Sequence, residues 1–163
     1  MKKLIMIIIA AIYVVTSGGC KKEPELPPEQ LLISPKGWIQ TAQTVSPVRL
    51  INNIMVTDYY HQVLSDCKKD DILFLTSTGL LNGQYTITEG PSRCNAADPS
   101  TVDSGTWTLN EAKTMIEFQS SAPAAVPYTY TIVELSSSIF KSKRVEVDNA
   151  TSYTYTITYV PVK

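Results

Sequence analysis

The sequence predicts an all-β domain, an eight-stranded antiparallel meander preceded by a short helical turn. Runs rich in Val, Ile, Thr and Tyr recur along the chain and alternate between apolar and polar residues, as strands with one buried face do. Short polar turns join most of these runs. No crossover helix long enough for a βαβ unit is predicted, so neighbouring strands are expected to be antiparallel. Eight such strands either close into a barrel or split into a sandwich, and we favour the barrel.

The first part of the domain is less regular than the rest. A helical turn is predicted over residues 29–34, and a strand follows over residues 37–45. An irregular connection is predicted over residues 46–58. Asp58 then has the position and the side chain of an N-cap for a short helix over residues 59–65.

A β-hairpin is predicted at the centre of the chain. Strands 72–78 and 84–89 flank the pair Asn82-Gly83, whose residue types supply the positive φ angles of a tight turn. Cys67 precedes the first strand and Cys94 follows the second. A hairpin brings its open ends together, so we expect a disulfide between these two cysteines, the alternative being two free thiols.

Five further strands complete the predicted sheet. A polar loop separates them from the hairpin, and they are expected over residues 105–109, 114–119, 126–135, 139–148 and 151–160. Alternation in the first two places their large apolar side chains toward the core, namely Trp107, Leu109, Ile116 and Phe118.

The N-terminus has the pattern of an export signal. Lys2 and Lys3 precede an apolar run over residues 4–15, which is too short for a membrane span of about 20 residues. We therefore divide the chain into a signal peptide over residues 1–19, a charged and proline-rich flexible tether over residues 20–29, and a folded domain over residues 30–163.

The end of this signal, Thr16-Ser17-Gly18-Gly19-Cys20, resembles the lipobox of bacterial lipoproteins. The resemblance implies cleavage before Cys20 and acylation of that cysteine, so that lipid chains such as palmitate hold the protein at a membrane. The alternatives are an ordinary secretory signal and an uncleaved anchor helix.

The charge of the chain excludes some partners. The chain has 14 basic and 15 acidic side chains, a net charge of −1, and loss of Lys2 and Lys3 with the signal changes this to −3. No basic stripe remains, so we expect no nucleic-acid partner.

No constellation of catalytic residues is evident, and we expect a protein that is not an enzyme. His61 is the only histidine and has no metal-ligating partner at a useful spacing, so neither a metal site nor a cofactor is predicted. Asp70 and Asp71 are adjacent, and neighbouring strand residues point to opposite faces. We weighed a calcium site that joins them to Asp98 or Asp103, and we favour turn and capping roles instead.

Aromatic residues give the candidate ligand contacts. Aromatic walls with polar tips are typical of small-ligand pockets. The alternative is that the same side chains simply fill a small barrel. The candidates are Trp38, Trp107, Tyr128, Tyr130, Tyr153, Tyr155 and Tyr159.

Residues 30–160 resemble the lipocalin-like domains of Gram-negative lipoproteins. The resemblance rests on the ordered series Leu31-Leu32, Gly37-Trp38, Cys67-Lys68-Lys69-Asp70-Asp71, Gly83 with Tyr85, Gly90, Cys94 and Gly105-Thr106-Trp107-Thr108-Leu109. It implies an eight-stranded lipocalin-like barrel.

The expected function follows from the anchor and the barrel together. We expect an outer-membrane lipoprotein, facing the periplasm or exposed at the cell surface, whose barrel binds a small hydrophobic ligand or a protein partner. The alternative is a structural or interaction module with a filled barrel and no ligand.

Overall fold

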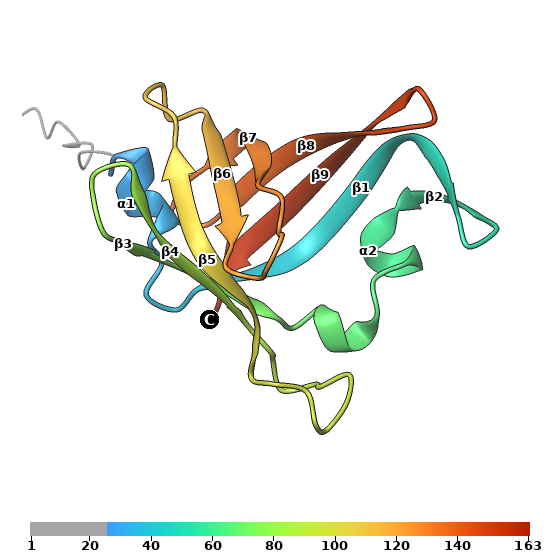
Figure 1. Ribbon diagram of the computed structural model, residues 1–163, viewed down its shortest axis with the longest axis horizontal. Helices are drawn as coiled ribbons and strands as arrows, with labels where there is room; N and C mark the ends of the chain where they lie inside the picture. The colour runs from blue at the N-terminus through green and yellow to red at the C-terminus, as the bar shows by residue number, and fades with distance from the viewer. Residues whose placement is uncertain (1–25) are drawn as a thin grey trace, which may run out of the picture.

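The structure is a computed structural model that describes residues 26–163 (Figure 1). The predicted signal peptide, Cys20 and the first part of the tether lie outside the described residues. The elements in chain order are α1 (Pro28–Leu32), β1 (Trp38–Ile51), β2 (Ile54–Asp58), α2 (Tyr59–Gln62), the 3-10 helix η1 (Asp66–Lys68), β3 (Ile72–Ser77), β4 (Asn82–Thr88), β5 (Thr101–Leu109), β6 (Met115–Ser120), β7 (Tyr128–Leu135), β8 (Phe140–Asp148) and β9 (Thr151–Pro161).

The strands form a closed antiparallel barrel. Their order in the sheet is β2-β1-β3-β4-β5-β6-β7-β8-β9, and β1 also pairs with β9. Strands β1 and β3 to β9 therefore form a closed barrel. From β3 to β9 each strand lies beside its neighbour in the chain, and β1 lies between β3 and β9. This confirms the predicted eight-stranded lipocalin-like barrel with a short N-terminal helix. Helix α1 begins at Pro28, so the last two residues of the predicted tether are helical.

Closure of the barrel is uneven. Strand β1 pairs with β9 from Trp38 to Ser46, but it pairs with β3 at only two positions, Trp38↔Leu73 and Ile39↔Ile72. Beyond Ile39, β1 and β3 are not hydrogen bonded to each other. Strand β3 begins at Ile72, the partner of Ile39, so farther along β1 no residue of β3 lies beside it. We call the opening at this place, between β1 and the segment that leads into β3, the side window.

One strand was missed by the sequence analysis. Residues 46–58, predicted to be irregular, instead continue β1 to Ile51 and return as β2. Asn52 and Asn53 both have positive φ, 49° and 65°, which is the backbone of a type I′ turn. Strands β1 and β2 and the β8–β9 hairpin extend together beyond the barrel (Figure 1), and we call this extension the wing.

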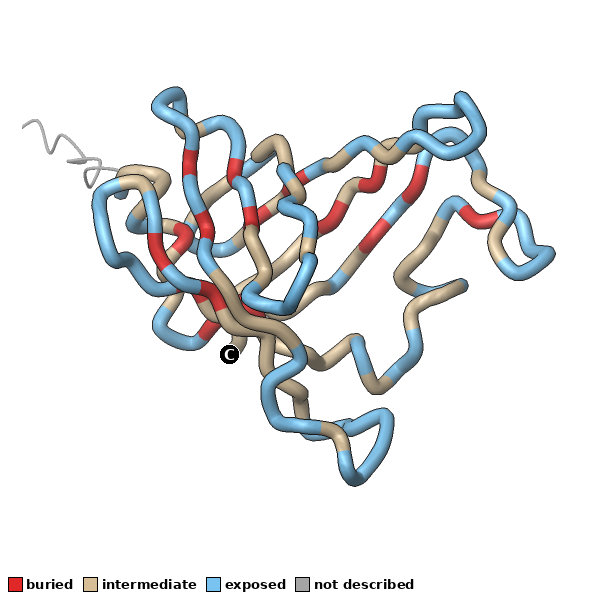
Figure 2. The backbone as a smooth tube through the Cα atoms, in the orientation of Figure 1, coloured by how far each residue is buried: buried red, intermediate tan, exposed pale blue. Residues whose placement is uncertain are grey.

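The core has two parts (Figure 2). The larger fills the barrel and includes both tryptophans, and the predicted core residues Trp107, Leu109, Ile116 and Phe118 belong to it. The smaller lies in the wing around Val45, Val56 and Tyr155.

Helix α1 covers one end of the barrel. Leu32 is fully buried there, and its carbonyl accepts a hydrogen bond of 2.7 Å from the indole Nε1 of Trp38. Glu29 in the same helix forms an ion pair with Lys113 of the β5–β6 turn, at 2.8 Å. This end is therefore closed, and access to the interior comes from the opposite end or through the wall.

The central hairpin forms, but its turn differs from the prediction. Asn82 and Gly83 lie within β4, and Gly83 pairs with Ser77 of β3. Gly83 is required for a different reason, because the ring of Trp107 packs over it. A Cβ on Gly83 would lie 1.8 Å from the carbonyl oxygen of Thr76 and 2.7 Å from Nε1 of Trp107.

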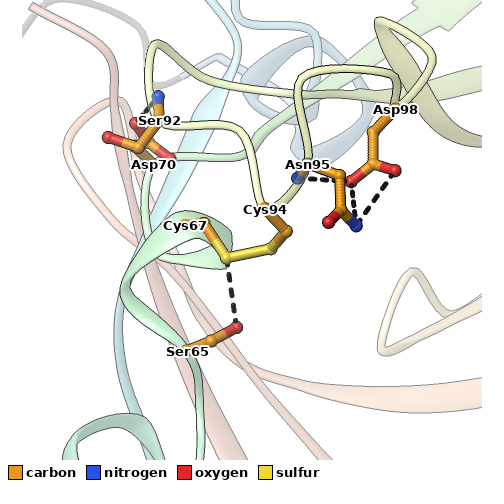
Figure 3. The surroundings of a disulfide bond; sticks show 7 residues. All are labelled: Ser65, Cys67, Asp70, Ser92, Cys94, Asn95 and Asp98. Atoms are coloured by element: carbon orange, nitrogen blue, oxygen red, sulfur yellow. Dashed lines mark hydrogen bonds between the residues drawn. A yellow bond between two sulfur atoms is a disulfide. The ribbon is translucent and has the colours of Figure 1, made fainter.

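The predicted disulfide is confirmed (Figure 3). Cys67 in η1 and Cys94 in the β4–β5 loop are joined, with their Cα atoms 5.1 Å apart. Asp70 supports the same loop by accepting a 2.8 Å hydrogen bond from the backbone N–H of Ser92. The β4–β5 loop ends at Thr101, four residues earlier than the predicted start of the next strand.

Two smaller predictions concern helices. Asp58 caps α2 as expected, since its carboxylate accepts a hydrogen bond from the backbone N–H of His61. The helix spans only Tyr59–Gln62 rather than residues 59–65.

Among residues 26–163, no helix has the length and apolar character needed to span a bilayer.

Candidate ligand-binding site

The barrel interior holds a small aromatic cavity of about 60 Å³, which we call the inner cavity. Three of the predicted tyrosines line it, namely Tyr128, Tyr130 and Tyr159. Its other walls are Leu73, Tyr85, Ile87 and Phe118. This volume accommodates a few water molecules but is well below the 300 Å³ or so of typical small-molecule pockets.

The inner cavity carries polar groups at one side. Tyr85 donates a 2.7 Å hydrogen bond to Asp103, whose other carboxylate oxygen accepts one of 2.6 Å from Ser120. The Asp103 carboxylate is thereby held against the barrel wall by three donors, including its own neighbour's backbone N–H at Ser104. Asp103 itself does not line the cavity, whose surface is formed largely by the tyrosine rings.

Burial favours the neutral form of the tyrosines around this cavity. It raises the pKa of Tyr130 to about 12, although the nearby Arg144 guanidinium opposes the rise. Burial also raises the pKa of Tyr85, Tyr128 and Tyr159. The cavity walls are therefore uncharged at neutral pH and suit an apolar guest.

The side window adds a second space of about 180 Å³. It shares three wall residues with the inner cavity, which are Leu73, Ile87 and Tyr159. The remaining lining is Gln40, Leu64, Lys68, Asp71 and Val102. Lys68 and Val102 are exposed and form the outer rim, so the window leads from solvent to the wall of the inner cavity.

The disulfide holds one border of this window. Leu64, Lys68 and Asp71 come from the segment between α2 and β3, and Cys67 lies within it. The covalent link to Cys94 ties this segment to the β4–β5 loop. The window is thus bounded by a chain segment that is fixed at its middle rather than only at its ends.

A third space lies at the open end of the barrel, under the wing. This mouth cleft has a volume of about 320 Å³ and is lined by Arg49, Leu50, Ile51, Tyr59, Arg144, Glu146, Asp148 and Tyr155. Its charged residues already pair with one another. Arg49 donates to Glu146 and Asp148, at 2.9 Å each, and Arg144 forms an ion pair with Glu146 at 2.5 Å.

Arg49 acts as a clamp across the wing. Its guanidinium also donates to the hydroxyl of Tyr155 and lies 4.8 Å from the ring centre of Tyr153. The hydrogen bonds to Tyr155, Glu146 and Asp148 raise the pKa of Arg49 further above its already high ordinary value. Because Arg49 is on β1 and its carboxylate partners are on β8, the clamp joins the two hairpins of the wing.

Arg144 separates the mouth cleft from the inner cavity. Its guanidinium lies 5.4 Å from the ring centre of Tyr155, which lines the cleft, and 6.0 Å from that of Tyr130, which lines the cavity. The residues that line the side window take part in none of these ion pairs.

The predicted ligand contacts fall into three groups. Tyr128, Tyr130 and Tyr159 are brought together in the inner cavity, while Tyr155 lines the mouth cleft beside Tyr153. The two tryptophans line none of these spaces. Trp38 is 1 % exposed and packs edge to face on Phe140, and Trp107 is fully buried with its Nε1 donating to the Thr76 carbonyl. Both therefore have structural roles.

Several lining residues were not predicted as contacts. Tyr85 and Ile87 alternate along β4, and this pattern was a usable signal because it places both on the inner face. Arg49 gave no such signal, since its segment was predicted to be irregular. The window residues Gln40, Leu64 and Val102 come from three separate elements, and only the fold brings them together.

The described residues contain no group of three or more His, Cys, Asp or Glu side chains placed to hold a metal ion. Asp98 is engaged in its own loop, where it accepts a 2.9 Å hydrogen bond from the backbone N–H of Asn95 (Figure 3). Asp103 is held in the barrel wall as described above. The two carboxylates therefore have separate roles in loop and barrel.

Comparison with known proteins gives likenesses in structure only. No family model matches the chain, and no curated protein matches it. Among solved structures, a complex of bovine odorant binding protein with undecanal is similar, with 12% sequence identity and a TM-score of 0.45. The alignment covers 88% of this chain and 78% of that one. The fold assignment stands on the strand order of the chain itself.

Proposed function

We propose that this chain is an exported lipoprotein whose lipocalin-like barrel binds a small hydrophobic molecule. The observation that carries the proposal is the contact between the inner cavity and the side window, which share Leu73, Ile87 and Tyr159. An apolar cavity of about 150 Å³ holds a benzene-sized molecule. The window has a volume of about 180 Å³, although it is open to solvent and has the polar Gln40, Lys68 and Asp71 in its lining, and the inner cavity adds apolar space beside it.

Export and anchoring are supported by two independent features. Disulfides persist in oxidising compartments, and Cys67 is bonded to Cys94. Cys20 follows directly after the small residues that end the apolar N-terminal run. We infer an acylated Cys20 and a location at the outer membrane, with the barrel on the periplasmic or the outer side.

A retention experiment tests the binding proposal. The exported full chain carrying Cys20→Ser cannot be acylated and is purified without detergent. It is incubated with a bacterial membrane extract and analysed by native mass spectrometry. We expect a retained apolar molecule of about benzene size or slightly larger, and its absence under all loading conditions argues against the proposal.

A matched pair of variants locates the retained molecule. Val102→Trp fills the rim of the window and is expected to abolish retention. Val133→Trp makes the same change at an exposed position of β7 that lines none of the three spaces, and it should retain the molecule fully.

The second candidate is a structural module without a ligand. It is favoured by the small size of the inner cavity, because the tyrosines and Phe118 fill most of the barrel themselves. Phe118, Tyr128 and Tyr130 contact one another there, Phe118 stacked on Tyr128 and both edge to face with Tyr130. Under this alternative, the protein retains no ligand, while Cys20 is acylated in the native protein.

The anchor has its own test. The intact mass of the native mature protein should correspond to residues 20–163 plus acyl chains on Cys20. An unmodified Cys20, or a chain that still carries residues 1–19, contradicts the lipoprotein assignment while leaving the binding proposal open.

A further inference from the structure

The side window contains a carboxyl group that the packing of the fold does not explain. Asp71 lines the window at the start of β3, among the apolar side chains of Leu64, Leu73 and Val102. Its Oδ1 atom is buried and makes no hydrogen bond within the described chain. A buried acceptor without a donor is unfavourable, and Oδ1 gains a donor if the carboxylate turns toward a polar group in the window.

The surroundings of Asp71 are acidic. Burial is the main cause that raises its pKa, and the carboxylates of Glu89 and Asp70 raise it further. The backbone N–H of Gly90 and, to a smaller extent, the charge of Lys68 act in the opposite direction. Glu89 likewise has a buried carboxylate oxygen without a partner.

From this arrangement we infer that the ligand of the barrel is an amphiphile with a hydrogen-bond-donating head group, an amine before an alcohol, that meets Asp71 in the side window. The inference rests on the proposed function and specifies its ligand class. The apolar body of the molecule lies against Leu73, Ile87 and Tyr159, which lead to the inner cavity. The head group stays near the rim, where Gln40 and Lys68 lie.

Charge decides between head groups. A protonated amine supplies the donor that Oδ1 of Asp71 lacks and is attracted by the neighbouring Glu89 and Asp70. A neutral hydroxyl supplies the donor without the attraction. A carboxylate supplies no donor and is repelled by the same groups, with Lys68 as the one opposing charge among the residues that act on Asp71.

The test compares four probes that share a phenyl ring and have similar size. They are 2-phenylethylamine, 2-phenylethanol, phenylacetate and ethylbenzene, titrated into the exported full chain carrying Cys20→Ser at pH 7. Dissociation constants come from protein-detected NMR. We expect the amine to bind at least tenfold more tightly than phenylacetate, with the alcohol between them. Equal affinity for the amine and phenylacetate overturns the inference.

Variants assign the preference to Asp71. Asp71→Asn should weaken amine binding about tenfold and change ethylbenzene binding less than threefold. The control Asp66→Asn removes the same charge from the same segment, at an exposed side chain that pairs with Lys69, and should leave all four constants unchanged. An unchanged amine preference in Asp71→Asn overturns the inference.

If Asp71→Asn does not fold, Val102→Trp replaces it. This variant changes an exposed rim position and should weaken the amine at least tenfold, and unaltered amine binding overturns the inference. The two proposals fail differently. Binding of ethylbenzene without a head-group preference removes only the present inference, whereas failure of all four probes removes the proposed function as well.

Discussion

Gly83 shows how a single residue fixes the barrel wall. It faces Trp107 directly across the β4–β5 ladder, and the indole lies over the glycine while its Nε1 reaches the Thr76 carbonyl on β3. Three strands are thereby joined at one point. The absence of a side chain at residue 83 is what lets the ring approach.

Substitution of this glycine tests that description. Gly83→Ala should lower the free energy of unfolding by about 2–3 kcal/mol, because the added Cβ meets backbone as well as the ring. The measurement is urea unfolding followed by tryptophan fluorescence. Gly79→Ala is the control, since its Cβ meets only the side chain of Asn82. Equal effects of the two substitutions would contradict the packing argument.

The inner-cavity tyrosines predict a pH dependence. Folding raises the pKa of Tyr130 to about 12, whereas the unfolded chain ionises it near 10. The unfolded state therefore loses this proton first, and the stability due to Tyr130 is complete below pH 10 and is lost as the pH rises toward 12.

The measurement is the free energy of unfolding between pH 9 and pH 12. It should fall over this range, and Tyr130→Phe should make the fall shallower. Tyr60→Phe is the control, because Tyr60 lies on α2 outside the cavity. A stability that is flat from pH 9 to pH 12 is the result that contradicts a buried, neutral tyrosine cluster.

At the scale of elements, the disulfide-bounded segment is the feature on which the side window depends. The bond joins residues 27 apart in sequence, and the loop it closes contains the whole β3–β4 hairpin. Loop-closure entropy alone gives a stabilisation of about 3.6 kcal/mol.

Removal of the bond should therefore be strongly destabilising. The double variant Cys67→Ala/Cys94→Ala is expected to unfold at a free energy about 3 kcal/mol lower than the parent, as measured in urea. Ser65→Ala, a change beside the disulfide that leaves it intact, is the control (Figure 3). A loss below 1 kcal/mol would show that the segment is held by its packing rather than by the bond.

The eight barrel strands were predictable because β-branched, aromatic and other apolar residues recur in short runs, several of which alternate with polar residues. The last strand is the clearest case, with Tyr155 and Ile157 buried as the pattern requires. Strand β2 was missed because its segment exposes Ile54 and Met55, so no alternation between buried and exposed positions marks it. The two asparagines of its turn were the remaining signal.

The site was less predictable than the fold. In β1, the register shifts between Gln40 and Ala42, so the inward face changes from Trp38 to Gln43 and Val45, and no residue type in the sequence marks this bulge. The side window exists because β3 begins only at Ile72, the partner of Ile39, so β1 runs on without β3 beside it. This separation is a property of the closed sheet and cannot be derived from any one strand.

At the scale of the whole molecule, one end of the barrel is closed, and the ion pairs of Arg49 and Arg144 lie at the other. Helix α1 and Trp38 close the first end, and Arg144 stands between the mouth cleft and the inner cavity. The wing is held by the Arg49 clamp. We therefore propose the side window as the opening for an apolar molecule, because none of its lining residues takes part in these ion pairs.

The most direct test of the central claim is where an apolar probe binds. The exported chain carrying Cys20→Ser is labelled at its Leu, Ile and Val methyl groups and titrated with ethylbenzene, with methyl NMR as the readout. The account predicts that the largest shifts occur at Leu73 and Ile87. Shifts confined to the mouth residues Leu50 and Ile51 or to the exposed Val147, or no saturable shift at all, would contradict it.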